Sequence, residues 1–515
     1  MNKLRILCVP ALMTSLLMGC AQTNAVSNTT NTSQTIADGI KIAFTDSAIN
    51  TSSSTGIEVD GTNLTITQSG TYVLSGSCTN GSVKVKKGTT GVHIILNGLT
   101  LASQDTAPIV CAKSSEVTIE AAENTENTFS DTENNNDENG NTNAENAVIK
   151  CKDGSNVTLC GSGTLNIQAN GKNGIKSGAS TDTEGEASLT IQDLTLHIEA
   201  SINDAVNAEN ELNVLSGTLT ISSGDDALHS DMTLNVGKDG SDGPTITITD
   251  CNEGLEGAAV NVYSGNIDIV STDDCINGAN ADLTDYAYQI NISGGTITAY
   301  SSAGDGFDSN GDLTISGGNV TVWTANAADN EPLDADGTVT VSGGTVLAAG
   351  GSSGMGINLE ATQPCVVYSN AGTMGMQDVP EDGGKQFGGS QTPNMNGEKP
   401  SGDQQMDEKQ PPEMSGGNDA QTPQGNPGGM QNAMLSEGSS FTIADSDGNV
   451  LYEGNAVCNA SYVFFSSSDI TSDTTYTLTN GDTTMDSEGQ SGTIASGMGG
   501  GTPMNQPSKK EEKSV

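Results

Sequence analysis

The residues of this chain best suited to chemistry are acids that recur in a four-residue pattern: an acidic, a small, an apolar and a polar residue. Asp274-Cys275-Ile276-Asn277 is one copy, and successive copies begin about 21 to 31 residues apart. The acids that open the six copies are Asp204, Asp226, Glu253, Asp274, Asp305 and Glu331. The residues that close them are Asn207, His229, Glu256, Asn277, Asp308 and Asp334. Oxygen ligands of this kind suit a hard cation, calcium above all.

We call each copy of the four-residue pattern a quartet. The spacing of the quartets predicts that they stack on successive coils of a repeating structure. The opening acids would then form one column and the closing residues a second, with coils about 4.8 Å apart. Two unit charges at that distance repel by roughly 3.5 kcal/mol, even at an effective dielectric constant of about 20. Because a column of ionised carboxylates would outweigh the net stability of a domain, we predict that Ca²⁺ bridges adjacent coils through these residues. The alternative is a solvated acidic face with some protonated carboxyl groups. We expect His229 to be a bystander, since a hard cation prefers oxygen.

The elements that must position these acids are short strands joined by glycine turns. After residue 157, each repeat has a strand, a Ser-Gly-Gly turn, a second strand, a variable loop and then a quartet; Ser316-Gly317-Gly318 is one such turn. Glycine supplies the positive φ at the corners. Three short strands per repeat, each parallel to its counterpart in the next, predict an all-β fold, a right-handed single-stranded parallel β-helix (a solenoid).

The rest of the chain divides by composition. Residues 1–20 resemble a lipoprotein signal peptide that ends in Leu17-Met18-Gly19-Cys20, so Cys20 is the predicted lipidation site. Residues 21–39 are expected to be a flexible tether and residues 40–376 the β-helix, with an acidic loop at 120–146. A Gly/Pro/Gln/Met-rich insert at 377–438 is expected to be disordered, strands at 439–480 to close the β-helix, and the tail 481–515 to be disordered. The protein is thus predicted to be exported and anchored at the cell surface by lipid.

The net charge limits the classes of binding partner, and the cysteines raise the question of disulfide bonds. With 18 basic and 64 acidic residues, the net charge is −46, which argues against nucleic acid and against membrane binding other than through a lipid anchor. Export permits disulfides. Aligning residues 116–119 with 156–159 puts Cys111 and Cys151 at the same place on neighbouring coils, and this predicts a disulfide between them, with stacked free thiols as the alternative.

Enzyme activity must be weighed because basic or paired acidic residues could act on a glycan. A lyase needs a base for the proton beside a uronate carboxylate, and in the quartet region only Lys176 and Lys238 offer one. Each is more simply a surface charge. The segment Thr272-Asp273-Asp274-Cys275 resembles the aspartate pair of polygalacturonases, but the histidine loop and basic cluster of that family are missing. Adjacent aspartates of a strand also point to opposite faces, so we expect this pair not to converge.

Several features together resemble an exported bacterial carbohydrate-binding domain family with a parallel β-helix fold. They are the Gly304-Asp305-Gly306-Phe307 motif, the Ser-Gly-Gly-Thr turns, an acidic, Asn-rich loop before residues 146–149, and the stretch 463–467 leading to 475–477. The resemblance covers most of residues 40–480.

The resemblance implies non-catalytic, calcium-supported binding of plant cell-wall polysaccharide, with a preference for acidic sugars such as polygalacturonate. By position, the six opening acids would carry the calcium. A strongly acidic protein could hold an acidic polymer only through shared divalent cations, so the charge agrees with this expectation. We therefore predict no enzyme activity. Two alternatives stay open: a calcium-dependent β-helix lyase, and a structural surface adhesin.

Overall fold

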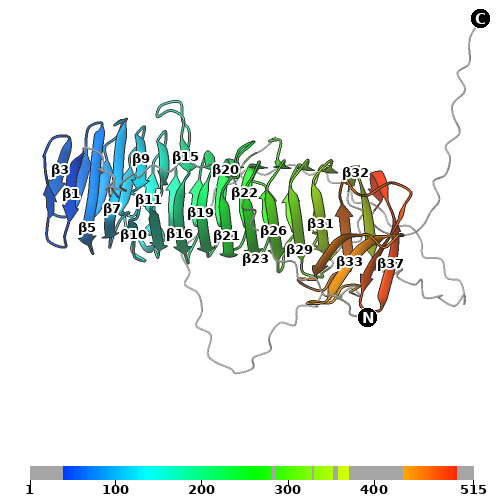
Figure 1. Ribbon diagram of the computed structural model, residues 1–515. Coiled ribbons are helices and arrows are strands. Elements are labelled where there is room, and N and C mark those ends of the chain that lie inside the picture. Colours follow the sequence, from blue (N-terminus) through cyan, green and yellow to red (C-terminus); the bar gives the residue numbers. More distant parts are fainter. Residues whose placement is uncertain are drawn as a thin grey trace, which may run out of the picture. The chain divides into compact units, whose positions relative to one another are not determined.

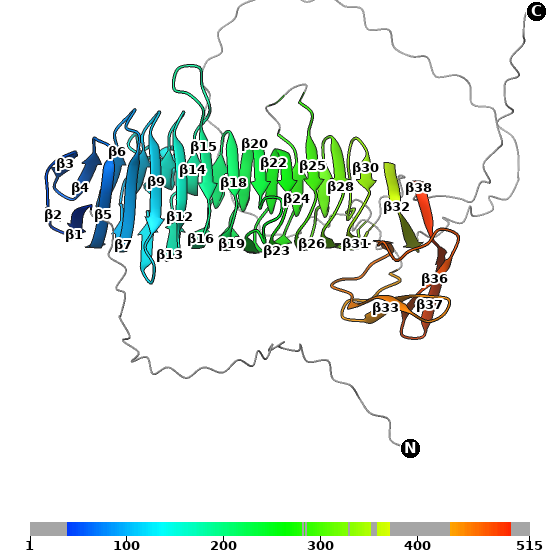
Figure 2. The ribbon, with the colours of Figure 1, turned by 45° about the horizontal axis from the view of Figure 1, so that its top comes forward.

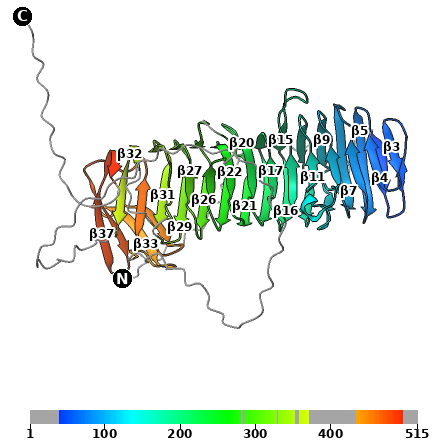
Figure 3. The ribbon, with the colours of Figure 1, turned by 180° about the vertical axis from the view of Figure 1, so that it is seen from behind.

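The computed structural model describes residues 39–280, 283, 286–327, 330–351, 358–370 and 433–495. Within these residues the chain is all-β, with one short 3₁₀-helix, η1 (Asp137–Asn139), as its helical element. Most strands join one long sheet whose pairs are predominantly parallel, and four strands form a small antiparallel sheet. Figure 1 shows the strands of the long sheet following one another in chain order, and Figure 3 shows the same succession from behind.

Three ladders of parallel strands run through the long sheet, because each strand pairs with its counterpart in the next repeat. The first ladder, which carries the quartets, contains β4 (Asn63–Ile66), β6 (Ser82–Val85), β8 (Ile109–Cys111), β11 (Ala147–Cys151), β14 (Asn173–Ser177), β17 (Val206–Ala208), the first parts of β20 (Leu228–Val236) and β22 (Leu255–Val262), β24 (Ile276–Gly278) and β27 (Phe307–Ser309).

The second ladder contains the first parts of β5 (Gly70–Cys78) and β7 (Val92–Ala102), β9 (Glu116–Ala121), β12 (Asn156–Gly161), β15 (Ser188–Ile191), β18 (Glu211–Val214), the last parts of β20 and β22, β25 (Gln289–Ile292), β28 (Asp312–Ile315), β30 (Val339–Val341) and β32 (Asn358–Ser369). The third contains the last parts of β5 and β7, β10 (Glu126–Ser130), β13 (Thr164–Ala169), β16 (Leu194–Ala200), β19 (Gly217–Ser223), β21 (Thr245–Asp250), β23 (Asn266–Ser271), β26 (Thr296–Ser301), β29 (Asn319–Thr324) and β31 (Thr345–Gly350).

The core lies between the ladders and is filled by stacked aliphatic side chains. Alternation along each strand decides which side chains enter it, since successive residues point to opposite faces. In β16, for example, Leu194, Leu196 and Ile198 are buried, and the residues between them are at least partly exposed. Stacking of like residues in register, such as Leu196 on Leu219, makes this core continuous along the sheet.

The two ends of the long sheet are closed differently. At the N-terminal end, β1 (Ile40–Phe44) pairs with β2 (Ile49–Thr51), and β3 (Ile57–Asp60) with β4, in antiparallel fashion. At the other end, β35 (Tyr462–Ser466) pairs antiparallel with β31 and β32, and β38 (Gln490–Ala495) with β32. The small sheet has the order β34 (Val450–Asn455), β33 (Ser440–Asp445), β36 (Thr475–Asn480) and β37 (Thr483–Glu488), orange to red in Figure 2. Its Phe441 packs edge-on against Trp323 of β29.

Three predicted boundaries need correction. The acidic loop was placed at 120–146, but β10 lies inside that range because Phe129 is buried and pairs with the third ladder; the loop proper follows Ser130. Strand structure continues past 480, because β37 forms a hairpin with β36 and Ile494 of β38 is buried in the main core. Order also resumes before 439, where Leu435 is buried and bridges to Ala460. The signal peptide with Cys20, almost all of the tether and most of the insert lie outside the described residues.

Candidate cation site along the acidic columns

Backbone pairing confirms the predicted alignment of the quartets. The apolar third residues, Val206, Leu228, Leu255, Ile276 and Phe307, are paired in one row and wholly buried. The closing residues form the outward row beside it, which we call the closing row: Asn207 pairs with His229, His229 with Glu256, Glu256 with Asn277, and Asn277 with Asp308. Asp334 follows, since Phe307 bridges to Leu333. The first ladder therefore holds all the candidate ligands in order.

Packing against the next repeat leaves room for only a small side chain at the second position of several quartets. A Cβ atom at Gly306 would overlap the carbonyl oxygen of Pro332 and a methyl group of Val322, and one at Gly254 would overlap the carbonyl oxygen of Cys275. Ala205 and Ala227 are wholly buried at the equivalent positions. Close packing at the second residue brings the opening acid of a quartet near the backbone of the next repeat.

Several opening acids point along the column, each toward the next coil. Asp204 Oδ1 accepts a hydrogen bond from the backbone N–H of Asp226 (3.3 Å), and Asp226 Oδ1 accepts one from Glu253 (3.3 Å). Asp274 Oδ1 likewise accepts the N–H of Asp305 at 2.7 Å, and Asp305 Oδ1 accepts the N–H of Glu331. These bonds satisfy one oxygen of each carboxyl group and leave the other for side-chain or cation contacts.

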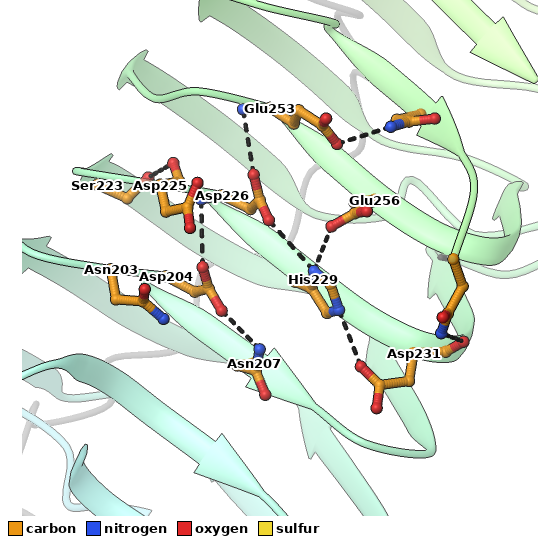
Figure 4. A network of polar contacts seen from close by, with 12 residues as sticks. Asn203, Asp204, Asn207, Ser223, Asp225, Asp226, His229, Asp231, Glu253 and Glu256 are labelled. Atoms are coloured by element: carbon orange, nitrogen blue, oxygen red, sulfur yellow. Dashed lines mark hydrogen bonds and ion pairs between the residues drawn. The ribbon is translucent and has the colours of Figure 1, made fainter. Parts of the chain in front are cut away.

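Side-chain oxygens of Asp204 and Glu253 accept hydrogen bonds from asparagines of the closing row (Figure 4). Asn207 Nδ2 donates to Asp204 Oδ2 at 2.5 Å, and Asn277 Nδ2 donates to Glu253 Oε2 at 2.9 Å. With their amino groups turned to the acids, both asparagines have a buried Oδ1 that accepts no hydrogen bond from any described residue. Asn277 is only 9% exposed. A buried amide oxygen without a donor, next to carboxylates, is a suitable ligand for a hard cation.

Four of the six opening acids are buried, and Glu253 and Asp305 are half-buried. Asp204, Asp226, Asp274 and Glu331 are each less than a tenth exposed. Burial, with neighbouring acids adding to its effect, raises the pKa of Asp204 to about 6, of Asp274 to about 7, of Asp305 to about 8 and of Glu253 to about 9. Burial likewise raises the pKa of Asp308 to about 6. Several of these carboxyl groups therefore hold protons near neutral pH when no cation is bound.

His229 takes part in the acidic columns rather than standing beside them. Its Nδ1 contacts Asp226 Oδ2 (3.2 Å) and Glu256 Oε2, and its Nε2 contacts Asp231 Oδ1 at 2.9 Å (Figure 4). Burial alone would lower its pKa, but hydrogen bonds to these three carboxylates raise the pKa of His229 to about 12. A protonated His229 is thus an internal counter-cation. Its position in the closing row was visible in the sequence, but its contact with Asp231 depends on the path of β20.

Three groups of side chains could each hold a metal ion, with ligand atoms within 4.8 Å of one another. They are Asp204 with Asp226 and His229; Asp226 with Glu253 and Glu256; and Asp305 with Asp308 and Asp334. The second and third groups offer only carboxylate oxygens, but Asp226 and Glu256 of the second contact His229, so the third group fits calcium best. The first contains an imidazole that already serves as a counter-cation, so it fits least. Asp274 and Glu331 belong to none of the three groups, although Asp274 is bound to the backbone of Asp305.

The other predicted site residues are placed as follows. Cys111 and Cys151 are paired, wholly buried and present as thiols, so their disulfide stays a prediction. Lys176 is half-buried and lies 3.5 Å from Glu209, whereas Lys238 is exposed.

The expectation that Asp273 and Asp274 diverge is wrong. They lie in a bend before β24 rather than in a strand, so alternation between faces does not apply to them. The Oδ1 atoms of both flank Gly304. The Asp273 charge also helps to raise the pKa of Asp274, although burial is the larger cause.

The comparisons with known proteins define the class to which the chain belongs. Residues 60–241 and 236–375 match a family described as carbohydrate-binding domain-containing protein, and the chain belongs to this family. Within the described residues, no helix is long and apolar enough to cross a membrane.

Two proteins similar to this chain can be described. A protein of Acetivibrio thermocellus, described as a carbohydrate-binding domain-containing protein, is 28% identical over 178 residues, which are 34% of this chain and 60% of that protein. The chain thus spans 60% of the length of this curated relative. A solved structure titled as the polysaccharide lyase-like protein from C. thermocellum, in a gadolinium derivative, is 24% identical with a TM-score of 0.32, over 60% of this chain and 93% of that one.

Proposed function

We propose that this protein binds acidic polysaccharide through calcium and performs no chemistry on it, with polygalacturonate as the representative ligand. Membership of the carbohydrate-binding family supports a glycan partner. The observation that carries the calcium part is the group formed by Asp305, Asp308 and Asp334, three carboxylates on adjacent coils with ligand atoms within 4.8 Å. A protein with a net charge of −46 needs such a cation to hold a polyanion.

The geometry suggests how protein and sugar would share the ion. Calcium takes six to eight oxygen ligands at about 2.3–2.6 Å. Three carboxylates leave several positions for oxygens of the ligand, and Asp305, Asp308 and Asp334 are all half-buried rather than enclosed. A uronate carboxylate would complete the shell. The group of Asp226, Glu253 and Glu256 is a second candidate, which binding would have to free from His229.

The scaffold we propose is a right-handed, single-stranded parallel β-helix. It is supported by the three parallel ladders, in which corresponding strands of successive repeats pair in register. Such a scaffold would hold the ligands at the regular spacing of paired strands, about 4.8 Å. A rigid row of sites suits a long polymer better than a small molecule, because each repeat of the row can meet another repeat of the chain.

We further propose that the protein is exported and held at the cell surface by a lipid on Cys20. The segment Leu17-Met18-Gly19-Cys20 supports this proposal. Mass spectrometry of the mature N-terminus from native membranes should find a diacylglyceryl-modified Cys20. An unmodified N-terminus, or one that precedes Cys20, contradicts the anchor and leaves the binding proposal standing.

The binding proposal is tested by affinity electrophoresis through polygalacturonate, in calcium and in chelator. We expect retardation in calcium only, and Asp308→Asn should weaken it. The matched control is Asp268→Asn, which changes an exposed acid of β23 in the third ladder. Equal retardation with chelator, or the same behaviour of both variants, refutes the calcium site. Sustained formation of unsaturated products would overturn the non-catalytic assignment, and a glycan array without retained sugars in either buffer would favour a structural adhesin.

A further inference from the structure

One half-buried lysine differs from all others in the described part of the chain. Five lysines there are half-buried: Lys113, Lys150, Lys152, Lys172 and Lys176. Four of them form ion pairs with acids, at 2.5–3.5 Å. Lys150 forms none with any described residue, in a protein that has far more acids than bases. A half-buried ammonium group without a partner calls for a counter-anion.

Lys150 lies in the closing row, on the same ladder as the acidic columns. It is paired with Lys176, and Lys176 is paired with Asn207. Read along the ladder, the row therefore runs from these two lysines through Asn207 and the protonated His229 to Asp308, with Asp334 following it. The cationic end and the candidate calcium end belong to one line of outward-facing side chains.

Few negative charges near Lys150 are available to neutralise its ammonium group. Burial and the neighbouring charge of Lys176 lower the pKa of Lys150, and the charges of Glu209 and Glu145 offset this only in part. Both acids already have lysine partners, since Glu209 lies 3.5 Å from Lys176 and Glu145 lies 2.7 Å from Lys152. A lysine kept only to cover the sheet with its aliphatic stem could extend its ammonium group into water, as exposed Lys84 does earlier in the same ladder.

We propose that Lys150 and Lys176 form a direct subsite for a carboxylate group of an acidic polysaccharide that lies along the closing row. The two ammonium groups belong to strands about 4.8 Å apart, so one carboxylate, or two on successive sugars, can contact both. The polymer would then be held by lysines at one end of the row and through calcium at the other. This inference rests on the proposed function and adds a contact that needs no metal.

The test measures polygalacturonate binding to the full chain by calorimetry in calcium, with the variants Lys150→Gln and Lys176→Gln. Each should weaken binding roughly tenfold, and neither should alter calcium affinity measured without sugar. Lys238→Gln, which changes an exposed lysine outside the row, is the matched control. Methyl-esterified polygalacturonan, whose carboxyl groups are neutral, should not distinguish Lys150→Gln from the wild type.

The outcomes separate this inference from the proposed function. If the wild type binds with calcium and Lys150→Gln binds within twofold of it, the subsite is refuted and the calcium proposal stands. If the wild type fails to bind polygalacturonate in calcium, the proposed function is refuted, and the subsite with it. Thermal melting verifies folding: Lys150→Gln should melt no lower than the wild type, because the change removes an unpaired charge beside Lys176.

Discussion

Replacing Asp274 with asparagine (Asp274→Asn) is expected to raise stability at pH 8 without calcium, and to raise it less when calcium is bound. Asparagine keeps an Oδ1 atom that can accept the backbone N–H of Asp305, which Asp274 now accepts at 2.7 Å. The substitution therefore removes the ionisable group and little else. Asp274 is 8% exposed, and burial raises its pKa from 3.8 to about 7.

The magnitude follows from the difference in pKa between the folded and unfolded states. Because the folded pKa of Asp274 is the higher one, its contribution to stability is fully present below pH 3.8 and is lost as the pH rises through about 7. At about 1.4 kcal/mol per pH unit, the loss reaches roughly 4 kcal/mol at pH 8. Without calcium, Asp274→Asn should match the wild type near pH 4 and exceed its unfolding free energy by up to about 4 kcal/mol at pH 8.

Calcium should narrow the difference between the two proteins. A ligand at a thousand times its dissociation constant adds about 4 kcal/mol to the folded state. The wild type should gain this stabilisation, and the variant should gain less because its column has lost one charge. Urea unfolding from pH 4 to 8, in metal-stripped buffer and in calcium, measures both effects. A variant that is less stable than the wild type at pH 8 without metal would show that the Asp274 carboxyl is not strained by burial, and would refute this reasoning.

Four further predictions follow from the same structure. Calcium binding at pH 7 should release protons, because the raised carboxyl pKa values leave protons to displace; calorimetry in buffers of different ionisation enthalpy would disprove this by giving identical heats. His229→Gln should lower metal-free stability by roughly 3 kcal/mol at pH 6, and less as the pH rises toward 12, since His229 stabilises fully below 6.5; a pH-independent loss contradicts the ion-pair role. Oxidation should join Cys111 to Cys151 and raise stability by about 4 kcal/mol, and peptide mapping that finds only free thiols argues against it. Gly306→Ala should cost roughly 1–3 kcal/mol by overlap with the next coil, and an unchanged urea midpoint would contradict that packing.

The sequence was sufficient to predict which residues share a row. The acidic, small, apolar, polar pattern predicts an inward apolar side chain in each quartet, and backbone pairing aligns those side chains from Val206 to Phe307 as expected. Alternation along a strand determines which face of the sheet each side chain occupies, and a one-residue shift in register would move every side chain to the opposite face. The same pattern could not locate β10, because a single apolar residue, Phe129, stands in a run of polar and acidic ones.

What the sequence determined is therefore the order and register of the candidate ligands, since both follow from local alternation and repeat spacing. Only the tertiary structure decided their burial, their hydrogen bonds and their protonation. Pairing each repeat with the next buries most of the opening acids, lets several of them accept hydrogen bonds from backbone N–H groups, and raises their pKa values. It also gives His229 three carboxylate partners, while Lys150 has no ion-pair partner among the residues that the structure describes. Desolvation and charge pairing depend on every neighbour in space, and some of those neighbours, such as Glu256 beside His229 and Asp305 beside Asp274, lie more than twenty residues away in the chain.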